Sequence, residues 1–121
     1  MAENANFLKS PEHYKHTLFT IATGGINAGE IALVGSLYVL AFNTYAAAAI
    51  GVGVTECDMC EIPKSEGTGL TIAANAFLYL KTSTLVVSTT QGTGDLFIGW
   101  SIEAATATAT HVLGCWKGGQ T

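Results

Sequence analysis

The sequence predicts an all-β fold, a small compact barrel or sandwich of about eight short strands with an extended N-terminal arm. Two observations predict it. From Thr17 onward, short apolar runs rich in Val, Ile, Thr, Tyr and Phe are interrupted at close intervals by glycine, of which the chain has 14. In addition, only two stretches, 45–49 and 102–107, could be helical, and both are short for stable helices. Closure or packing of the strands is expected because it protects their edges.

The apolar runs define the expected strands, and turn residues separate them. The strands are 17–22, 31–34, 37–42, 49–55, 77–80, 85–88, 96–102 and 109–116, with turns at 23–25, 35–36, 65–67 and 91–95. The two possible helices are 45–49 and 102–107. Within 104–110 small apolar residues alternate with Thr, which favours a strand or a loop leading into one. No repeat of 20 to 50 residues is visible, so a solenoid is not expected.

The chain divides into an arm, residues 1–16, and a single β-rich domain, residues 17–121. A length of 121 residues suits one core. The arm is polar and contains Pro11, with Phe7, Leu8 and Tyr14 as its candidate anchors. We expect it to order by laying Phe7 and Leu8 into a groove on a neighbour; a frayed terminus without a role is the alternative.

The composition predicts that part of the surface faces a protein partner. Hydrophobic residues make up 49% of the chain and charged residues 12%, too few charges to cover the outside of a monomer. The five basic residues are all lysines, they are scattered, and the formal net charge is -4. Direct binding of nucleic acid, which needs clustered positive charge, is therefore not expected.

A membrane-associated protein is the first alternative, because the 25 residues 31–55 carry no charge. However, Asn43 and Thr44 lie near the middle of this segment, and no lysine cluster flanks it. Strands joined by turns also produce long uncharged runs, so we expect no membrane association. The N-terminus lacks the pattern of a signal peptide, which predicts synthesis in the cytoplasm.

A zinc or thiol protein that uses Cys57 and Cys60 is the second alternative, since their spacing resembles a metal or redox motif. A structural zinc ion needs four ligands, and His111 and Cys115 are the remaining candidates. On an extended strand those two lie about 13 Å apart, too far to share an ion. We also expect nearby carboxylates to raise the pKa of both thiols. Those carboxylates belong to Glu56, Asp58 and Glu61. The simpler interpretation is free thiols in a surface turn, with no metal and no cofactor.

Enzymatic motifs are incomplete. The sequence around Ser101 comes within one residue of a G-x-S-x-G nucleophile elbow, but the final glycine is missing and no helix pattern follows. Asp95 and His111 could complete a triad on paper only. No phosphate-binding loop motif is present, and the charged segment 56–66 is expected to be a solvated loop or an edge strand. We expect no catalytic residues.

The two tryptophans, Trp100 and Trp116, lie in late predicted strands. Each side chain can fill the core or anchor an interface, because tryptophan is enriched among the residues that dominate binding energy. Together with Phe7, Leu8 and Tyr14 they are the candidate interface residues.

Five segments, in order and at similar spacing, give the chain a resemblance to the small cement, or decoration, proteins of tailed-phage capsids. They are ATGGINAGEIALVGSLYV (22–39), CEIPK (60–64), FLY (77–79), IGWS (98–101) and VLGCW (112–116). The resemblance covers most of residues 17–117. The chain departs from the family pattern at Asn75 and Ala76, where glycine and aspartate are usual, and the closing strand lacks its usual arginine.

The resemblance implies a structural virion protein that docks on the outer capsid surface, commonly as a homotrimer, and staples neighbouring subunits of the major capsid protein against the pressure of packaged DNA. Contacts with several subunits at once raise avidity. Some members of this family have been labelled predicted recombinases. The missing phosphate loop and the absence of a basic patch argue against that activity here.

Overall fold

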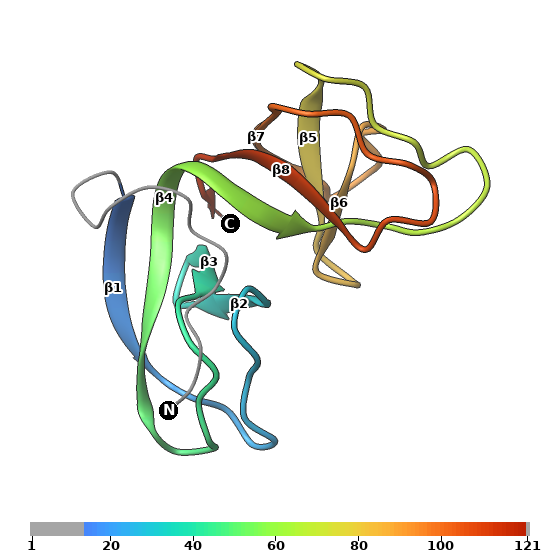
Figure 1. Cartoon of the computed structure of the whole chain (residues 1–121). Helices are drawn as coiled ribbons and strands as arrows, with labels where there is room; N and C mark the ends of the chain where they lie inside the picture. Colours follow the sequence, from blue (N-terminus) through green and yellow to red (C-terminus); the bar gives the residue numbers. More distant parts are fainter. Residues whose placement is uncertain (1–13, 121) are drawn as a thin grey trace.

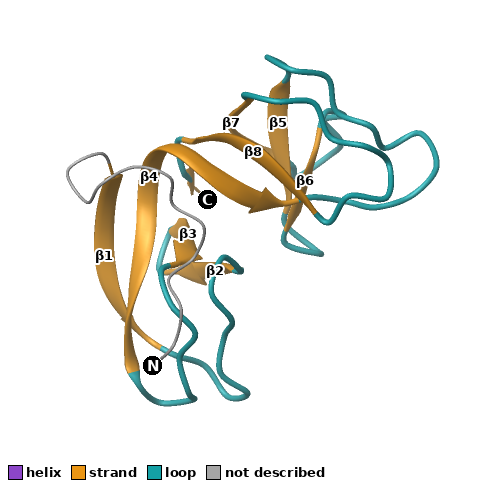
Figure 2. Cartoon of the chain, viewed as in Figure 1, coloured by secondary structure: helices purple, strands orange, loops and turns teal. Residues whose placement is uncertain are grey.

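The computed structural model describes residues 14–120, and within them it has nine β-strands and no helix (Figures 1 and 2). The strands are β1 (Tyr14–Thr20), β2 (Ile31–Val34), β3 (Leu37–Ala41), β4 (Ile50–Pro63), β5 (Phe77–Lys81), β6 (Val86–Ser88), β7 (Leu96–Ser101), β8 (His111–Trp116) and β9 (Gly119–Gln120). All these strands pair in antiparallel fashion. The all-β fold predicted from the sequence is confirmed.

The strands form one sheet in the order β2-β3-β4-β8-β7-β5-β6, with β1 added to β4 and β9 added to β3. A parallel bridge between Lys64 and Val87 brings β6 back to the end of β4. Beside it, the Ser65 amide donates a hydrogen bond to the Val87 carbonyl at 3.0 Å. The strands from β4 to β6 therefore curl into a nearly closed barrel, which leaves few strand edges open.

The long strand β4 joins two halves of the sheet, as Figure 1 shows. Its first half pairs with β1 and β3, and its second half pairs with β8. Two register irregularities interrupt it, one opposite Lys15 and His16 and one between Cys57 and Cys60. Bulges of this kind bend a strand. For 56–66 the sequence left a solvated loop or an edge strand open, and the structure has a strand as far as Pro63.

The two halves of the sheet have the same order of strands along the chain. In each half, two strands that pair with each other come before and after two inner strands that also pair. In the first half β1 and β4 enclose β2 and β3, and in the second half β4 and β8 enclose β5 and β7. The flanking loops also correspond, since Ile26 bridges Tyr45 and Ile72 bridges Ala105. The repeat is not visible in the sequence because β6 and residues 89–95 are inserted in the second copy only, which removes any constant period.

Buried side chains from both halves form one continuous hydrophobic core. Its members include Ile31, Tyr38, Leu40, Val54, Cys57, Cys60, Ile62, Ile72, Leu78, Leu80, Val87, Ile98, Val112 and Trp116. Because apolar burial is the main favourable term in folding, this shared core contributes to the stability of both halves.

One lysine is buried at the end of β4. Lys64 is 3% exposed, and its ammonium donates hydrogen bonds to the carbonyls of Ser65 (2.7 Å), Ala107 (3.4 Å) and Ala109 (3.2 Å). These carbonyls replace the water that the charge has lost. Lys64 thereby ties the loop 102–110 to the end of β4.

The remaining differences from the sequence prediction are local. Strand β1 begins at Tyr14, inside the segment assigned to the arm, because residues 14–16 already pair with β4. The two stretches that could have been helical, 45–49 and 102–107, form turns, bends and isolated bridges. The predicted turns at 23–25, 35–36 and 91–95 lie between strands as expected.

Candidate docking surface

The outward side of β5 and β7 carries four aromatic side chains, which we call the aromatic surface: Phe77, Tyr79, Phe97 and Trp100. Phe77 is 63% exposed, Phe97 46% and Trp100 38%. In β5 the alternate residues Leu78 and Leu80 are fully buried, so strand periodicity places Phe77 and Tyr79 on the opposite, outer face.

The aromatic side chains contact one another across the two strands. Phe77 lies opposite Trp100, and Tyr79 lies opposite Phe97. The rings of Phe77 and Phe97 meet edge to face with centroids 5.5 Å apart, and those of Tyr79 and Phe97 are 6.1 Å apart. The Lys117 ammonium lies 5.5 Å from the centroid of Trp100. These contacts hold the rings in place, so that a partner would meet an ordered surface.

A bulge in β7 allows Phe97 and Trp100, three positions apart, to point to the same side. Two residues, Ile98 and Gly99, lie between them, whereas only Leu78 separates the residues that they face on β5. Gly99 has a φ of +151°, and a Cβ at this position would lie 1.8 Å from the Cys115 carbonyl oxygen. Glycine is therefore required where β7 and β8 come together beneath the aromatic surface.

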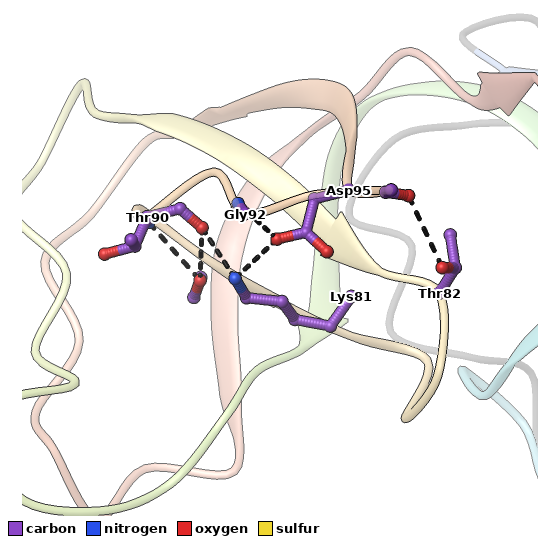
Figure 3. A network of polar contacts seen from close by, with 7 residues as sticks. Lys81, Thr82, Thr90, Gly92 and Asp95 are labelled. Carbon is purple, nitrogen blue, oxygen red and sulfur yellow. Dashed lines mark hydrogen bonds and ion pairs between the residues drawn. The ribbon is translucent and has the colours of Figure 1, made fainter.

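An ion pair marks the far end of the same two strands (Figure 3). The Lys81 ammonium lies 2.5 Å from the Asp95 carboxylate and also donates to the Thr90 carbonyl at 2.7 Å. The same carboxylate accepts a hydrogen bond from the Gly92 amide at 2.7 Å. These contacts fix the turn that leads into β7, and they hold the pKa of Asp95 below its ordinary value, with the Lys81 hydrogen bond as the main cause.

An open groove of about 640 Å³ begins at Phe97 and Lys117 and runs between the two halves of the sheet. Its lining combines charged and polar side chains with apolar ones, and includes residues of β1, β3 and β4. Lys15, His16 and Thr17 form its wall on β1, directly after the point where the described chain begins.

A second apolar surface lies on the other half of the molecule, on β1 and the first part of β4. We call Leu18, Ile50 and Val52 the aliphatic surface. Leu18 is 63% exposed, Ile50 is 71% exposed, and Val52 is the direct cross-strand partner of Leu18. The molecule therefore presents two separate apolar surfaces on two different pairs of strands.

The residues of the incomplete hydrolase motif are not brought together. Ser101 is fully buried, and its hydroxyl donates to the Ala73 carbonyl at 2.6 Å and accepts from the Ala76 amide at 2.9 Å. The His111 ring contacts the Thr110 hydroxyl at 2.9 Å, and Asp95 is engaged by Lys81. Ser101 serves to hold the loop 64–76 against β7.

The cysteines are buried on strands, so the expectation of a surface turn was wrong. Cys57 and Cys60 lie on β4 and Cys115 on β8, and all three are free thiols. A hydrogen bond from the Cys60 thiol lowers the pKa of Cys57 to about 7, against the expected rise. That hydrogen bond and burial raise the pKa of Cys60, and burial raises the pKa of Cys115. Within residues 14–120, no group of three or more His, Cys, Asp or Glu side chains is arranged to hold a metal ion.

The sequence-predicted interface residues have different positions. Phe7 and Leu8 lie outside the described residues, and Tyr14 begins β1 with its backbone paired to Cys57. Trp100 is on the aromatic surface, whereas Trp116 is fully buried and supports the sheet from inside. Sequence analysis missed Phe77, Tyr79 and Phe97, although the alternation in FLYL (77–80) indicated an outward pair.

The fold and the surface together describe a small β-protein that presents ordered apolar side chains to a partner. A model of the phage cement protein family matches residues 12–115. The chain belongs to this family, which gives it a structural, capsid-associated role. The comparisons with curated proteins and with solved structures gave no match. In the part of the chain that is described, no helix is long and apolar enough for a bilayer.

Proposed function

We propose that the protein binds the outer surface of a phage head, where it joins neighbouring subunits of the major capsid protein and stabilises the shell against the pressure of packaged DNA. The role is structural, with no catalytic step and no cofactor. Membership of the cement family supports the proposal. The observation that carries it is the aromatic surface, because ordered, exposed aromatic side chains of this number are typical of protein interfaces.

The aromatic surface contacts a second copy of the chain. Interfaces between permanent subunits resemble a protein core, being rich in aromatic residues and poor in charge. The Lys117 ammonium beside this surface is already engaged with Trp100. A copy of this chain, in which 12% of the residues are charged, is a suitable partner.

The homotrimer uses both apolar surfaces. In a closed ring of three, each copy presents one patch to one neighbour and a different patch to the other. The aromatic and aliphatic surfaces lie on different strand pairs of the two halves, as this arrangement requires. Each contact therefore joins the aromatic surface of one copy to the aliphatic surface of the next.

The N-terminal segment provides a further contact with a neighbour or with the shell. Its anchors Phe7 and Leu8 lie outside the described residues, but the described chain begins beside the wall of the groove. Several modest contacts, multiplied by three copies, give a long residence time on the shell.

Co-sedimentation tests this proposal. Purified protein is mixed with mature phage heads that lack it, and the heads are pelleted. The protein is expected to pellet with heads in a saturable amount that is a multiple of three per binding position, and to stay in solution without heads. A protein that remains in the supernatant at all concentrations would overturn the proposal. The same assay with residues 2–14 deleted measures how much the N-terminal segment contributes to binding of the heads.

A further inference from the structure

The bulge in β4 brings two thiols to the same side of the sheet. Residues three positions apart on a regular strand point to opposite faces. Here Cys57 faces Trp116 and Cys60 faces Gly114, so two residues of β4 oppose the single residue Cys115 of β8. As a result both Cys57 and Cys60 point into the core, where they are 2% and 0% exposed.

The two sulfur atoms are near enough to share a proton. The Cys60 thiol forms a hydrogen bond with Cys57, and the Cys57 sulfur also contacts the Met59 carbonyl oxygen at 3.2 Å. Cys115 is different. It is adjacent to Trp116 on β8, and because neighbouring residues of a strand face opposite sides, it lies on the outer side of the sheet. Cys57 and Cys60 therefore form a dithiol pair, and Cys115 is not part of it.

We infer that Cys57 and Cys60 form an oxidisable dithiol site, in which Cys57 is the nucleophile, Cys60 is the resolving thiol and hydrogen peroxide is the oxidant. Both thiols are buried, so peroxide reaches them through local opening of β4 at the bulge. The inference does not depend on binding to a phage head.

The reaction has two steps. The Cys57 thiolate attacks one peroxide oxygen, so that an S–O bond forms, the O–O bond breaks, and the departing hydroxide takes up a proton to become water. The Cys60 sulfur then attacks the Cys57 sulfur of the sulfenic acid. The S–S bond forms, the S–O bond breaks, and the hydroxyl leaves as water with the proton of Cys60. Two thiols give up two electrons to one peroxide molecule and yield a disulfide and two waters.

The properties of the site match these roles. The hydrogen bond from Cys60 lowers the pKa of Cys57 and so favours its thiolate, the reactive form, while the raised pKa of Cys60 keeps its proton in place until it resolves the sulfenic acid. Because β4 links both halves of the sheet, the disulfide fixes the bend between them. The link closes a very short loop, so its main effect is on local stiffness.

Intact mass spectrometry of the full chain tests the inference. The reduced protein is treated with peroxide between about pH 6 and pH 9, its free thiols are alkylated, and the linked cysteines are identified by peptide mapping. The unmutated protein and Cys115→Ser are expected to lose two hydrogen atoms through a link between Cys57 and Cys60. Cys60→Ser is expected to gain one oxygen at Cys57, which dimedone traps. The rate is expected to rise with pH through about 7, as Cys57 ionises.

Cys57→Ser is the decisive variant. It is expected to react at least about tenfold more slowly than the unmutated protein, because the nucleophile is lost and burial still raises the pKa of Cys60. Equal rates for the two proteins would overturn the inference, as would peroxide treatment that adds oxygen to the unmutated protein without forming the link. Should a variant fail to fold, peptide mapping of the unmutated chain decides the outcome alone.

Discussion

Trp100 lies directly opposite Phe77 across β5 and β7, and both side chains remain exposed, whereas Leu78 and Ile98 on the same strands are buried. An exposed pair of large aromatic residues on an ordered sheet leaves apolar area in contact with water. Covering that area by another protein releases free energy at about 25 cal/mol for each Å² buried. A partner that covers the aromatic surface therefore gains binding free energy from it.

Replacing the aromatic surface is expected to dissociate the trimer. Phe77 and Phe97 are the two most exposed of its rings, so the double variant Phe77→Thr/Phe97→Thr keeps strand propensity and removes the contact. We expect a monomer by sedimentation velocity, at a concentration where the unmutated protein is a trimer. Leu33→Thr, on β2, is the control, because Leu33 is also 50% exposed but lies on neither surface.

Pairing between unlike surfaces makes a more specific prediction. A Leu18→Thr/Ile50→Thr variant is also expected to be monomeric. Mixed in equal amounts with the aromatic variant, it is expected to form dimers and no trimers, since each mixed pair keeps one intact contact. If the mixture stays monomeric, or if the aliphatic variant alone remains a trimer, the unlike pairing is refuted.

Gly99 is expected to tolerate no side chain. A Cβ there would overlap the Cys115 carbonyl oxygen, and the backbone conformation is one that residues with side chains avoid. Gly99→Ala is expected to reduce the free energy of unfolding by at least about 3 kcal/mol, measured by urea denaturation. Gly94→Ala is the matched control. It also has a positive φ but nothing within 4 Å of the added atom, and it is expected to cost about 1 kcal/mol.

Much of the fold follows from local patterns in the sequence. The strand at 31–34 was predicted to the residue, because a run of four apolar residues, IALV, lies between two glycine-containing segments. For the second half of β4 the sequence left a loop and an edge strand open, because its acidic residues are typical of loops. In the structure those side chains point away from the core, while Cys60 and Ile62 face it.

The candidate surface could be predicted only in part, and for one physical reason. Bulges shift the alternation of side chains by one residue, and their positions depend on the partner strand. The bulge in β7 puts Phe97 and Trp100 on the same face, and the bulge in β4 does the same for Cys57 and Cys60. Neither relationship can be counted from the sequence of a single strand.

Lys64 is expected to stabilise the fold, although burial of a charged side chain is normally unfavourable. Lys64→Met keeps the length of the side chain but leaves three carbonyls without their donor. We expect a loss of about 2 to 3 kcal/mol in the free energy of unfolding. Lys15→Met is the control, because the Lys15–Glu56 pair is exposed and is expected to contribute less than about 1 kcal/mol. Equal effects of the two substitutions would contradict the assigned role.

Acid is expected to weaken the turn before β7. The pKa of Asp95 is lowered in the folded state, so its ionised form stabilises the fold above the ordinary aspartate pKa, and this stability is lost as the pH falls through the lowered value. Asp95→Asn removes this dependence. Thermal unfolding of both proteins from about pH 6 to about pH 2 should show a difference that is largest at pH 6 and shrinks toward pH 2. A constant difference would contradict the assignment.

Cryo-electron microscopy of phage heads mixed with the purified protein shows whether the protein docks on the outer capsid surface. Mature heads that lack the protein are expected to gain ordered density on their outer surface, at threefold or quasi-threefold positions, with each copy touching more than one major capsid subunit. Heads mixed with Phe77→Thr/Phe97→Thr are expected to gain little or none. Bare heads after mixing with the unmutated protein at saturating concentration would contradict the account.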